Sequence, residues 1–117
     1  MLGQDRPLAT DEKVRALLRR KPPGAAPSIE QAARRMGMSP RTLQRRLAGQ
    51  GLTFRRLVDE VRLEGAVNLL IGSELPITEI SARLGYSTPS GFCRAFSRWT
   101  GRSPSEIRRV TRTGSRA

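Results

Sequence analysis

The sequence contains no histidine, one cysteine and few aromatic residues: one tryptophan, one tyrosine and three phenylalanines. Without histidine, the chain excludes His-based catalytic triads, histidine metal sites and imidazole pH switches. The single cysteine, Cys93, forms neither an internal disulfide nor a thiolate metal cluster, so we expect no bound metal and no cofactor. The sequence also has no run of 18 apolar residues, and it therefore predicts no transmembrane helix.

Lysine is scarce too, although the chain is strongly basic. Of 22 Lys and Arg residues, Lys13 and Lys21 are the only lysines, so arginine supplies the remaining 20. Only 10 residues are Asp or Glu, and the formal net charge is +12. Such a charge favours a polyanionic partner, either nucleic acid or an anionic membrane surface. The planar guanidinium suits bidentate pairing with phosphate or guanine, whereas arginine-rich coding bias with added solubility is the alternative.

A length of 117 residues predicts one domain, or two very small ones that share a core. Within it, residues 28–39 resemble residues 76–87 at a shift of 48, with Gly37 matching Gly85. Beyond the glycine the shift becomes 49, which aligns Leu43 with Phe92 and Arg45 with Arg94. One extra residue in the second turn accounts for the change. The repeat indicates two copies of one structural unit.

The residue pattern of each copy predicts a helix, a turn that contains glycine and a second helix. In the first copy, Ser28 and Gln31 form a capping box, and Gly37 supplies the left-handed residue that ends a helix. Ser39 then caps the next helix, and Pro40 fits its first position. The second copy repeats this order, with Thr88 as the cap. This is the helix-turn-helix pattern with a short turn that contains glycine.

The remaining segments are also helical in pattern. We expect a helix from Asp11 to Arg20 capped by Thr10, and a long helix from the cap Thr53 to about Ile71. A last helix follows Ser103 and runs to about Val110. The prediction is therefore an all-α fold of two helix-turn-helix subdomains joined by a long linker helix; a single mixed bundle is the alternative. The expected divisions are a flexible segment 1–9, a first subdomain 10–52, the linker 53–72, a second subdomain 73–110 and a flexible tail 111–117.

The second helix of a helix-turn-helix enters the major groove of DNA, and helical phase predicts which residues face it. In the first such helix, about 40–48, Leu43 and Leu47 share an apolar face. The opposite face carries Arg41, Gln44 and Arg45, which are side chains suited to guanine and adenine edges. A plain solvated surface is the alternative for this face.

In the second helix, about 89–99, the residues Phe92, Phe96 and Trp99 form an apolar stripe. We interpret them as core rather than as a stacking platform for single-stranded nucleic acid. The other face carries Ser90, Gly91, Cys93, Arg94 and Ser97, of which only Arg94 has strong bidentate capacity. Cys93 is either a small residue facing the groove, which we favour, or a half-buried filler. This helix therefore reads fewer bases than the first, or acts through shape and backbone contact.

Several arginines lie at helix starts or in last turns, where they could hold phosphates with the help of helix N-termini. They are Arg55, Arg56, Arg98, Arg102, Arg108 and Arg109. A plain surface charge is the alternative for each. With the hydroxyl residues that flank the two predicted recognition helices, the expected DNA-backbone contacts are Ser39, Thr42, Arg55, Arg56, Thr88, Ser97, Arg98 and Arg102.

Residues 28–109 resemble the DNA-binding domain of the AraC/XylS family of bacterial transcription regulators. The first part of the resemblance is carried by Ala33, Gly37-Met38-Ser39, Leu43-Gln44-Arg45, Arg62, Ala66 and Leu69-Leu70. Its most specific part is carried by Ile80, Gly85-Tyr86-Ser87, Phe92, Arg94, Phe96, Gly101-Arg102-Ser103-Pro104 and Arg108.

The resemblance implies seven helices and two recognition helices in successive major grooves, about 34 Å apart. By position it places base reading on Arg41, Gln44, Arg45, Pro89, Ser90, Gly91, Cys93 and Arg94. Pro89, Ser90 and Gly91 depart from the stronger hydrogen-bonding residues that the family often has there. Many members also carry a longer sensing or dimerising domain, so we expect an excised C-terminal domain rather than a stand-alone short regulator.

We therefore expect sequence-specific binding of double-stranded DNA that regulates transcription. The expected setting is cytoplasmic and nucleoid-associated, with the isolated domain a monomer, no membrane partner and RNA polymerase as a further partner. Charge-driven, non-specific binding of DNA or RNA is the alternative. An enzyme is not expected, because the sequence lacks histidine, a paired-carboxylate motif and a phosphate-binding glycine loop.

Overall fold

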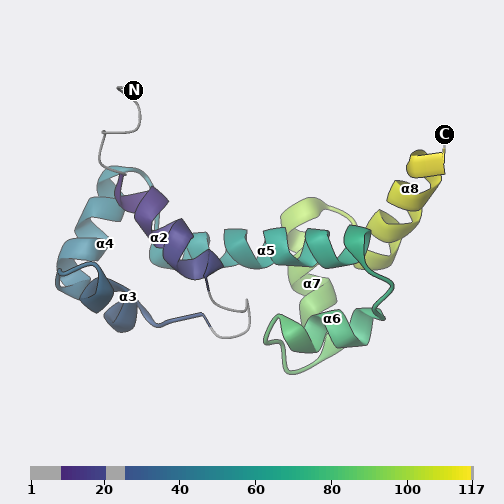
Figure 1. Cartoon of the computed structure of the whole chain (residues 1–117), viewed down its shortest axis with the longest axis horizontal. Helices are drawn as coiled ribbons and strands as arrows, with labels where there is room; N and C mark the ends of the chain where they lie inside the picture. The colour runs from purple at the N-terminus through teal and green to yellow at the C-terminus, as the bar shows by residue number, and fades with distance from the viewer. Residues whose placement is uncertain (1–8, 21–25, 117) are drawn as a thin grey trace. The chain divides into compact units, whose positions relative to one another are not determined.

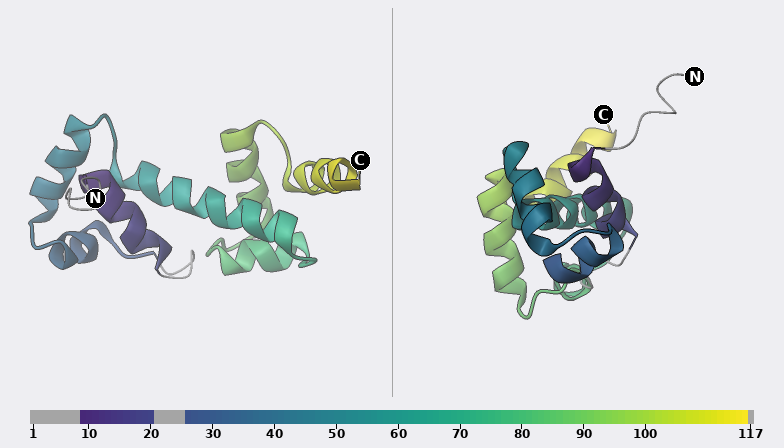
Figure 2. Two further views of the ribbon diagram at one scale, coloured as in Figure 1. Left: turned by 45° about the horizontal axis from the view of Figure 1, so that its top comes forward. Right: turned by 90° about the vertical axis from the view of Figure 1, so that its left-hand side faces the viewer.

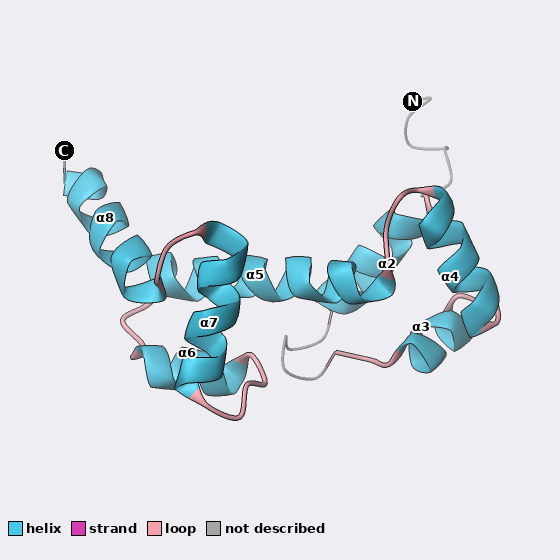
Figure 3. Ribbon diagram, turned by 180° about the vertical axis from the view of Figure 1, so that it is seen from behind, coloured by secondary structure: helices cyan, strands magenta, loops and turns pink. Residues whose placement is uncertain are grey.

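The computed structural model describes residues 9–20 and 26–116, and these residues form seven helices and no strand (Figures 1 and 3). This confirms the all-α prediction. The helices are α2 (Thr10–Arg19), α3 (Ile29–Arg35), α4 (Pro40–Gly49), α5 (Phe54–Gly72), α6 (Ile77–Arg83), α7 (Pro89–Thr100) and α8 (Pro104–Arg116).

The chain divides into two compact units, and the division falls inside α5, between Asp59 and Glu60. The first unit holds α2, α3, α4 and the start of α5, whereas the second holds the rest of α5 with α6, α7 and α8. The long helix predicted as a linker therefore contributes its two ends to different units. The expected flexible segment 1–9 lies outside the described residues, apart from Ala9.

The first unit is built around the apolar side of α4. This helix packs against both α2 and α3, and Figures 1 and 2 show the three helices gathered together. Its core is aliphatic: the buried side chains are Val14, Leu17, Leu18, Ala32, Ala33, Leu43, Leu47 and Leu57. Every one of these lies at the helical spacing that the sequence predicts.

The second unit is built around two phenylalanines. Phe92 and Phe96 of α7 are fully buried, and they pack with Ala66 and Leu70 of α5 and with Ile80 and Leu84. The rings of Phe92 and Phe96 lie 5.8 Å apart in a tilted arrangement, which is favourable for aromatic pairs. Trp99, expected in the same stripe, is only partly buried.

Helices α2 and α8 have bounds that differ from the sequence prediction. Helix α2 begins at Thr10 and not after it, because the Glu12 carboxylate accepts a hydrogen bond from the Ala9 N–H (2.7 Å) and moves the start one residue back. Thr10 is therefore not the cap. Helix α8 continues to Arg116, past the expected end at Val110, because no proline follows to stop it.

Candidate nucleic-acid interface

The turn that leads into α4 is fixed by three consecutive local features. Gly37 has a φ of 73°, a left-handed conformation that L side chains rarely adopt. The Ser39 hydroxyl accepts from the Thr42 N–H (3.1 Å) and donates to the Thr42 hydroxyl (3.0 Å). Pro40 occupies the first turn of the helix. The predicted cap is confirmed, and α4 starts at a defined residue with a defined phase.

That phase separates the two faces of α4. Leu43 and Leu47 are fully buried, and Arg41, Gln44 and Arg45 are all exposed. The structure therefore brings together the three predicted base-reading side chains on one solvent-facing surface. Arginine and glutamine there can pair with purine edges through two hydrogen bonds each.

A groove lies beside this surface, and no pattern in the sequence indicated it. Its volume is about 470 Å³, and its lining residues are Ile29, Gln44, Ala48, Leu52, Thr53, Phe54 and Arg55. Gln44, a predicted base contact, and Arg55, a predicted backbone contact, thus line the same groove. The side of α4 and the first turn of α5 form one continuous surface within the first unit.

The second helix-turn-helix has the same cap and one additional bond. Gly85 has a φ of 88°, and the Thr88 hydroxyl accepts from the Gly91 N–H (3.0 Å). Ser81, which is 1% exposed, donates its hydroxyl to the Thr88 carbonyl (3.1 Å). Its counterpart in the first copy is Ala33, which cannot form such a bond. The second turn is therefore tied to α6 by a side chain as well as by the backbone.

The exposed surface of α7 is poorer in hydrogen-bonding side chains than that of α4. Ser90 and Arg94 are exposed, as is Pro89 at the start of the helix. The Ser90 hydroxyl lies 3.4 Å from the Thr88 hydroxyl, which keeps it close to the cap. Arg94 is the one long polar side chain among the base-reading residues predicted on this helix.

The structure gives Gly91 and Cys93 local roles. A Cβ at Gly91 would lie 3.1 Å from the Thr88 hydroxyl oxygen, so glycine permits the tight cap. Cys93 is partly buried and packs against the hydrophobic cluster around Phe92. That packing matches the half-buried filler that the sequence left as the alternative for Cys93.

The turn before α7 carries an arginine contact that sequence reasoning did not assign. The Arg62 guanidinium carbon lies 5.4 Å from the centre of the Tyr86 ring, and this ring lies 5.6 Å from that of Phe92. The Arg62 Nε is buried without a hydrogen-bond partner among the described residues. A cation above an aromatic face is attracted by the ring quadrupole. Arg62 therefore fixes α5 against the second turn.

The predicted phosphate-binding arginines lie at the surface. Arg56, Arg98 and Arg102 are exposed, and Arg55 is 82% exposed, with its Nε 3.6 Å from an Asp59 oxygen. An exposed pair of that kind is weak, so Arg55 can exchange Asp59 for a phosphate. Thr53 caps α5 through the Arg56 N–H (3.1 Å), as predicted.

The predicted hydroxyl contacts are all engaged locally. Ser39, Thr42 and Thr88 take part in the caps described above. The Ser97 hydroxyl donates to the Arg102 carbonyl (3.3 Å), and so in this conformation its proton is directed at the protein. A phosphate would have to replace that acceptor.

Arg108 has a structural role, which differs from both alternatives that the sequence offered for it, a phosphate contact or a plain surface charge. Its guanidinium donates to the carbonyls of Leu69 (3.3 Å), Leu70 (3.0 Å), Ser73 (3.1 Å) and Leu75 (2.6 Å). These carbonyls lie at the end of α5 and just beyond it, where a helix leaves acceptors without partners. The sequence placed Arg108 on α8, but nothing local indicated which distant acceptors it would reach.

Within the described residues, no cluster of Cys, Asp or Glu could hold a metal ion. None of the helices described there is long and apolar enough to cross a membrane.

Comparison with known proteins identifies this architecture. A family model described as a helix-turn-helix domain matches residues 32–110. The chain belongs to the AraC-type helix-turn-helix family. Members of this family are DNA-binding regulators of transcription and not enzymes, and non-specific binding by charge alone is not favoured.

Three relatives illustrate the similarity. The HTH-type transcriptional regulator VqsM of Pseudomonas aeruginosa is 45% identical over 86 residues, which cover 74% of this chain and 26% of VqsM. The crystal structure of the transcriptional regulator CdpR from Pseudomonas aeruginosa has a TM-score of 0.77 at 39% identity, covering 86% of this chain and 31% of CdpR. The DNA-binding domain of AdpA, solved with a target DNA, has a TM-score of 0.75 at 26% identity, covering 91% and 96% of the two chains. The chain spans about a quarter of the length of the curated relatives it matches.

Proposed function

We propose that this AraC-type chain reads duplex DNA through α4 and α7 in successive major grooves, with α4 as the more discriminating helix. The observation that carries the proposal is the exposed surface of Arg41, Gln44 and Arg45 opposite the buried Leu43 and Leu47. Each good bidentate pair contributes about 1–3 kcal/mol of discrimination against a wrong base.

In this proposal α7 distinguishes fewer bases than α4 does. Arg94 supplies the hydrogen-bonding side chain, and Ser90, Gly91 and the accessible part of the half-buried Cys93 shape the surface that approaches the groove. Because small side chains have little reach, α7 discriminates mainly through Arg94 and through DNA shape.

The backbone contacts in the proposal are the exposed arginines and the hydroxyls at the helix starts. They are Ser39, Thr42, Arg55, Arg56, Thr88, Ser97, Arg98 and Arg102. The functional divisions are residues 10–52 and 73–110 as reading subdomains and 53–72 as the linker. With a net charge of +12, binding should weaken steeply with salt as counterions are released from DNA.

We further propose that the domain is a monomer that works in the cytoplasm at the nucleoid and contacts RNA polymerase when bound. Relatives such as the ornithine utilization regulator of Pseudomonas aeruginosa support a role in transcription regulation.

Selection of bound sites from a random duplex pool tests base reading. Arg45→Ala should relax the preference at defined positions of the selected site, and Arg56→Ala should weaken all sequences alike. Arg34→Ala, which changes an exposed arginine on α3, is the matched control. It should change neither the base preference nor the overall affinity for DNA strongly. Equal affinity of the unaltered chain for selected and scrambled duplexes at fixed salt would overturn the proposal.

A further inference from the structure

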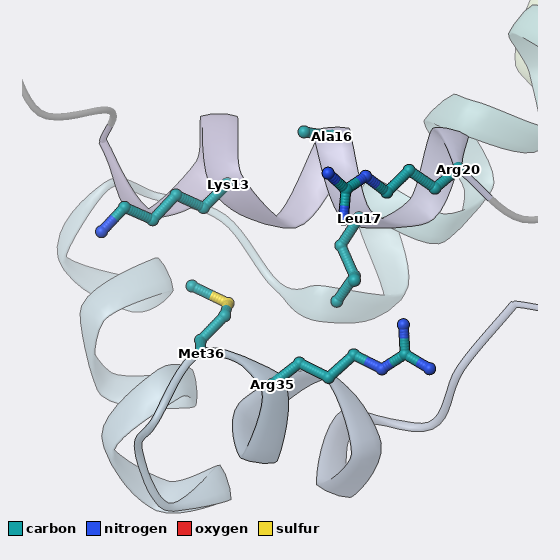
Figure 4. Close-up of a pocket in the computed structure, with 6 residues that line it drawn as sticks. All are labelled: Lys13, Ala16, Leu17, Arg20, Arg35 and Met36. Carbon is teal, nitrogen blue, oxygen red and sulfur yellow. The ribbon is translucent and has the colours of Figure 1, made fainter.

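A second surface of the first unit lies between α2 and the end of α3. It is a cavity of about 430 Å³ lined by Lys13, Ala16, Leu17, Arg20, Arg35 and Met36. Figure 4 shows Leu17 and Met36 reaching into the gap between the two helices. Lys13 lies toward one end, and Arg20 and Arg35 lie toward the other. The volume is within the range of sites that hold ligands or partner side chains.

The chemistry of this cavity is one-sided. Lys13, Arg20 and Arg35 are exposed, and among the described residues no ion pair engages them. No acidic side chain is among those that line the cavity. Three cations therefore surround an apolar floor. An anionic partner could pair with them without displacing an acidic side chain of the protein.

The cavity is separate from the surface proposed to read DNA. No residue of α4 lines it. Helix α4 packs against α2 and α3 through its face with the buried Leu43 and Leu47, whereas Arg41, Gln44 and Arg45 are exposed. None of the residues that line the cavity is among those proposed to contact DNA.

We propose that this cavity docks an acidic segment of a partner protein, with one apolar side chain inserted between Leu17 and Met36. Lys13 of α2 and Arg20, the residue that follows this helix and keeps a helical conformation, are seven residues apart, which is about 10 Å along the helix axis. An extended chain advances about 3.3 Å per residue, so acidic residues about three positions apart match both ends. A single small carboxylate reaches one end only. Methionine adapts to varied apolar partners, and this suits the floor of such a site.

The test uses the whole chain, labelled with ¹⁵N and saturated with duplex DNA so that α4 is occupied. The probes are synthetic peptides in which glutamates and aspartates flank a single leucine or phenylalanine at each possible register. We expect saturable shifts at Lys13, Ala16, Arg20, Arg35 and Met36 for the registers that fit. Peptides with lysine in place of the acidic residues are the control and should cause none.

A matched pair of variants separates this site from general attraction to a basic protein. Arg35→Glu should weaken the best peptide about tenfold. Arg34→Glu makes the same change in net charge at the adjacent exposed residue, which does not line the cavity, and should alter the affinity less than twofold. Thermal unfolding of both variants checks that each is folded, and Arg20→Glu provides a second variant of the site.

Three results would each overturn the proposal. The first is that no register of the peptide binds, and the second is equal weakening by Arg35→Glu and Arg34→Glu. The third is that acetate or inorganic phosphate produces the same shifts at the same concentration, since that would make it a small-anion site. The outcome that would overturn the proposed function, equal affinity for selected and scrambled duplexes, is a separate measurement from these three, so failure of the two proposals can be told apart.

Discussion

The two helix-turn-helix units have the same order of elements but different side chains in their cores and on their surfaces. The first fills its interior with aliphatic residues and exposes Arg41, Gln44 and Arg45 on α4. The second fills its interior with Phe92 and Phe96 and exposes Pro89, Ser90 and Arg94 on α7. A repeat can thus keep its turn geometry while core and surface diverge, because the cap and the left-handed glycine fix the backbone in both.

The units also differ in the polar contacts that hold their outer helices. In the first, Gln50 after α4 donates to the Asp11 carboxylate (2.8 Å) and accepts from the Asp11 N–H (3.2 Å). In the second, Arg108 of α8 reaches four carbonyls around the end of α5. A charged donor shared among part-buried acceptors stabilises more than an exposed amide–carboxylate pair.

The largest effect on stability should come from truncating a buried side chain in the core of either unit. Phe92→Ala should destabilise the second unit by about 3–5 kcal/mol, and Leu43→Ala, at the matching position, should destabilise the first by about 2–5 kcal/mol. Amide hydrogen exchange measured residue by residue checks both values. Each variant should lower protection in its own unit first. Uniform loss of protection across both units would show that the two cores unfold together.

The next effect tests the arginine contact in the second unit. Arg108→Ala should cost about 2–3 kcal/mol, because it removes charge-assisted hydrogen bonds and leaves part-buried carbonyls without donors. Denaturant unfolding followed by Trp99 fluorescence measures this change. Arg98→Ala, an exposed arginine of the same unit, is the control and should shift stability by less than about 0.5 kcal/mol. An equal, small change in the two variants would contradict the structural role of Arg108.

A smaller effect should follow from exchanging the residues that differ between the two turns. Ser81→Ala removes the hydroxyl that donates to the Thr88 carbonyl and should cost about 1 kcal/mol. Ala33→Ser places a hydroxyl at a fully buried site, where an unpaired polar group costs about 1–3 kcal/mol. Thermal unfolding compares the two. If Ala33→Ser proved neutral, the first turn would have an acceptor within reach of the new hydroxyl, and the two turns would differ less than the Ser81 hydrogen bond suggests.

The sequence predicted what depends on neighbours along the chain. The repeat, the caps at Ser28, Ser39, Thr53, Thr88 and Ser103, and the buried faces of α4 and α7 all follow from spacing within a few residues, and the structure confirms them. The sequence offered a phosphate contact or a plain surface charge for Arg108, and neither anticipates its role, because the carbonyls that it reaches lie more than thirty residues away. The contact between Arg62 and the Tyr86 ring was missed for the same reason, as were the groove beside α4 and the cavity between α2 and α3. Residue spacing within one helix carries no information about side chains that meet across helices.

The smallest effect concerns the acid dependence of the first unit. Hydrogen bonds from the Gln50 side chain and from Arg15 lower the pKa of the Asp11 carboxyl. A group whose pKa is lower in the folded state stabilises that state above its unfolded pKa, which for this carboxyl is about 3.8. The stabilisation is lost as the pH falls through the folded pKa. Asp11→Asn should therefore flatten the fall in stability of the first unit below about pH 4, measured by urea unfolding at a series of pH values. Gln50→Ala should also make the stability of the first unit less dependent on pH below about pH 4. If the pH dependence were unchanged in both variants, the hydrogen bonds between Asp11 and Gln50 would not contribute to the stability of the first unit.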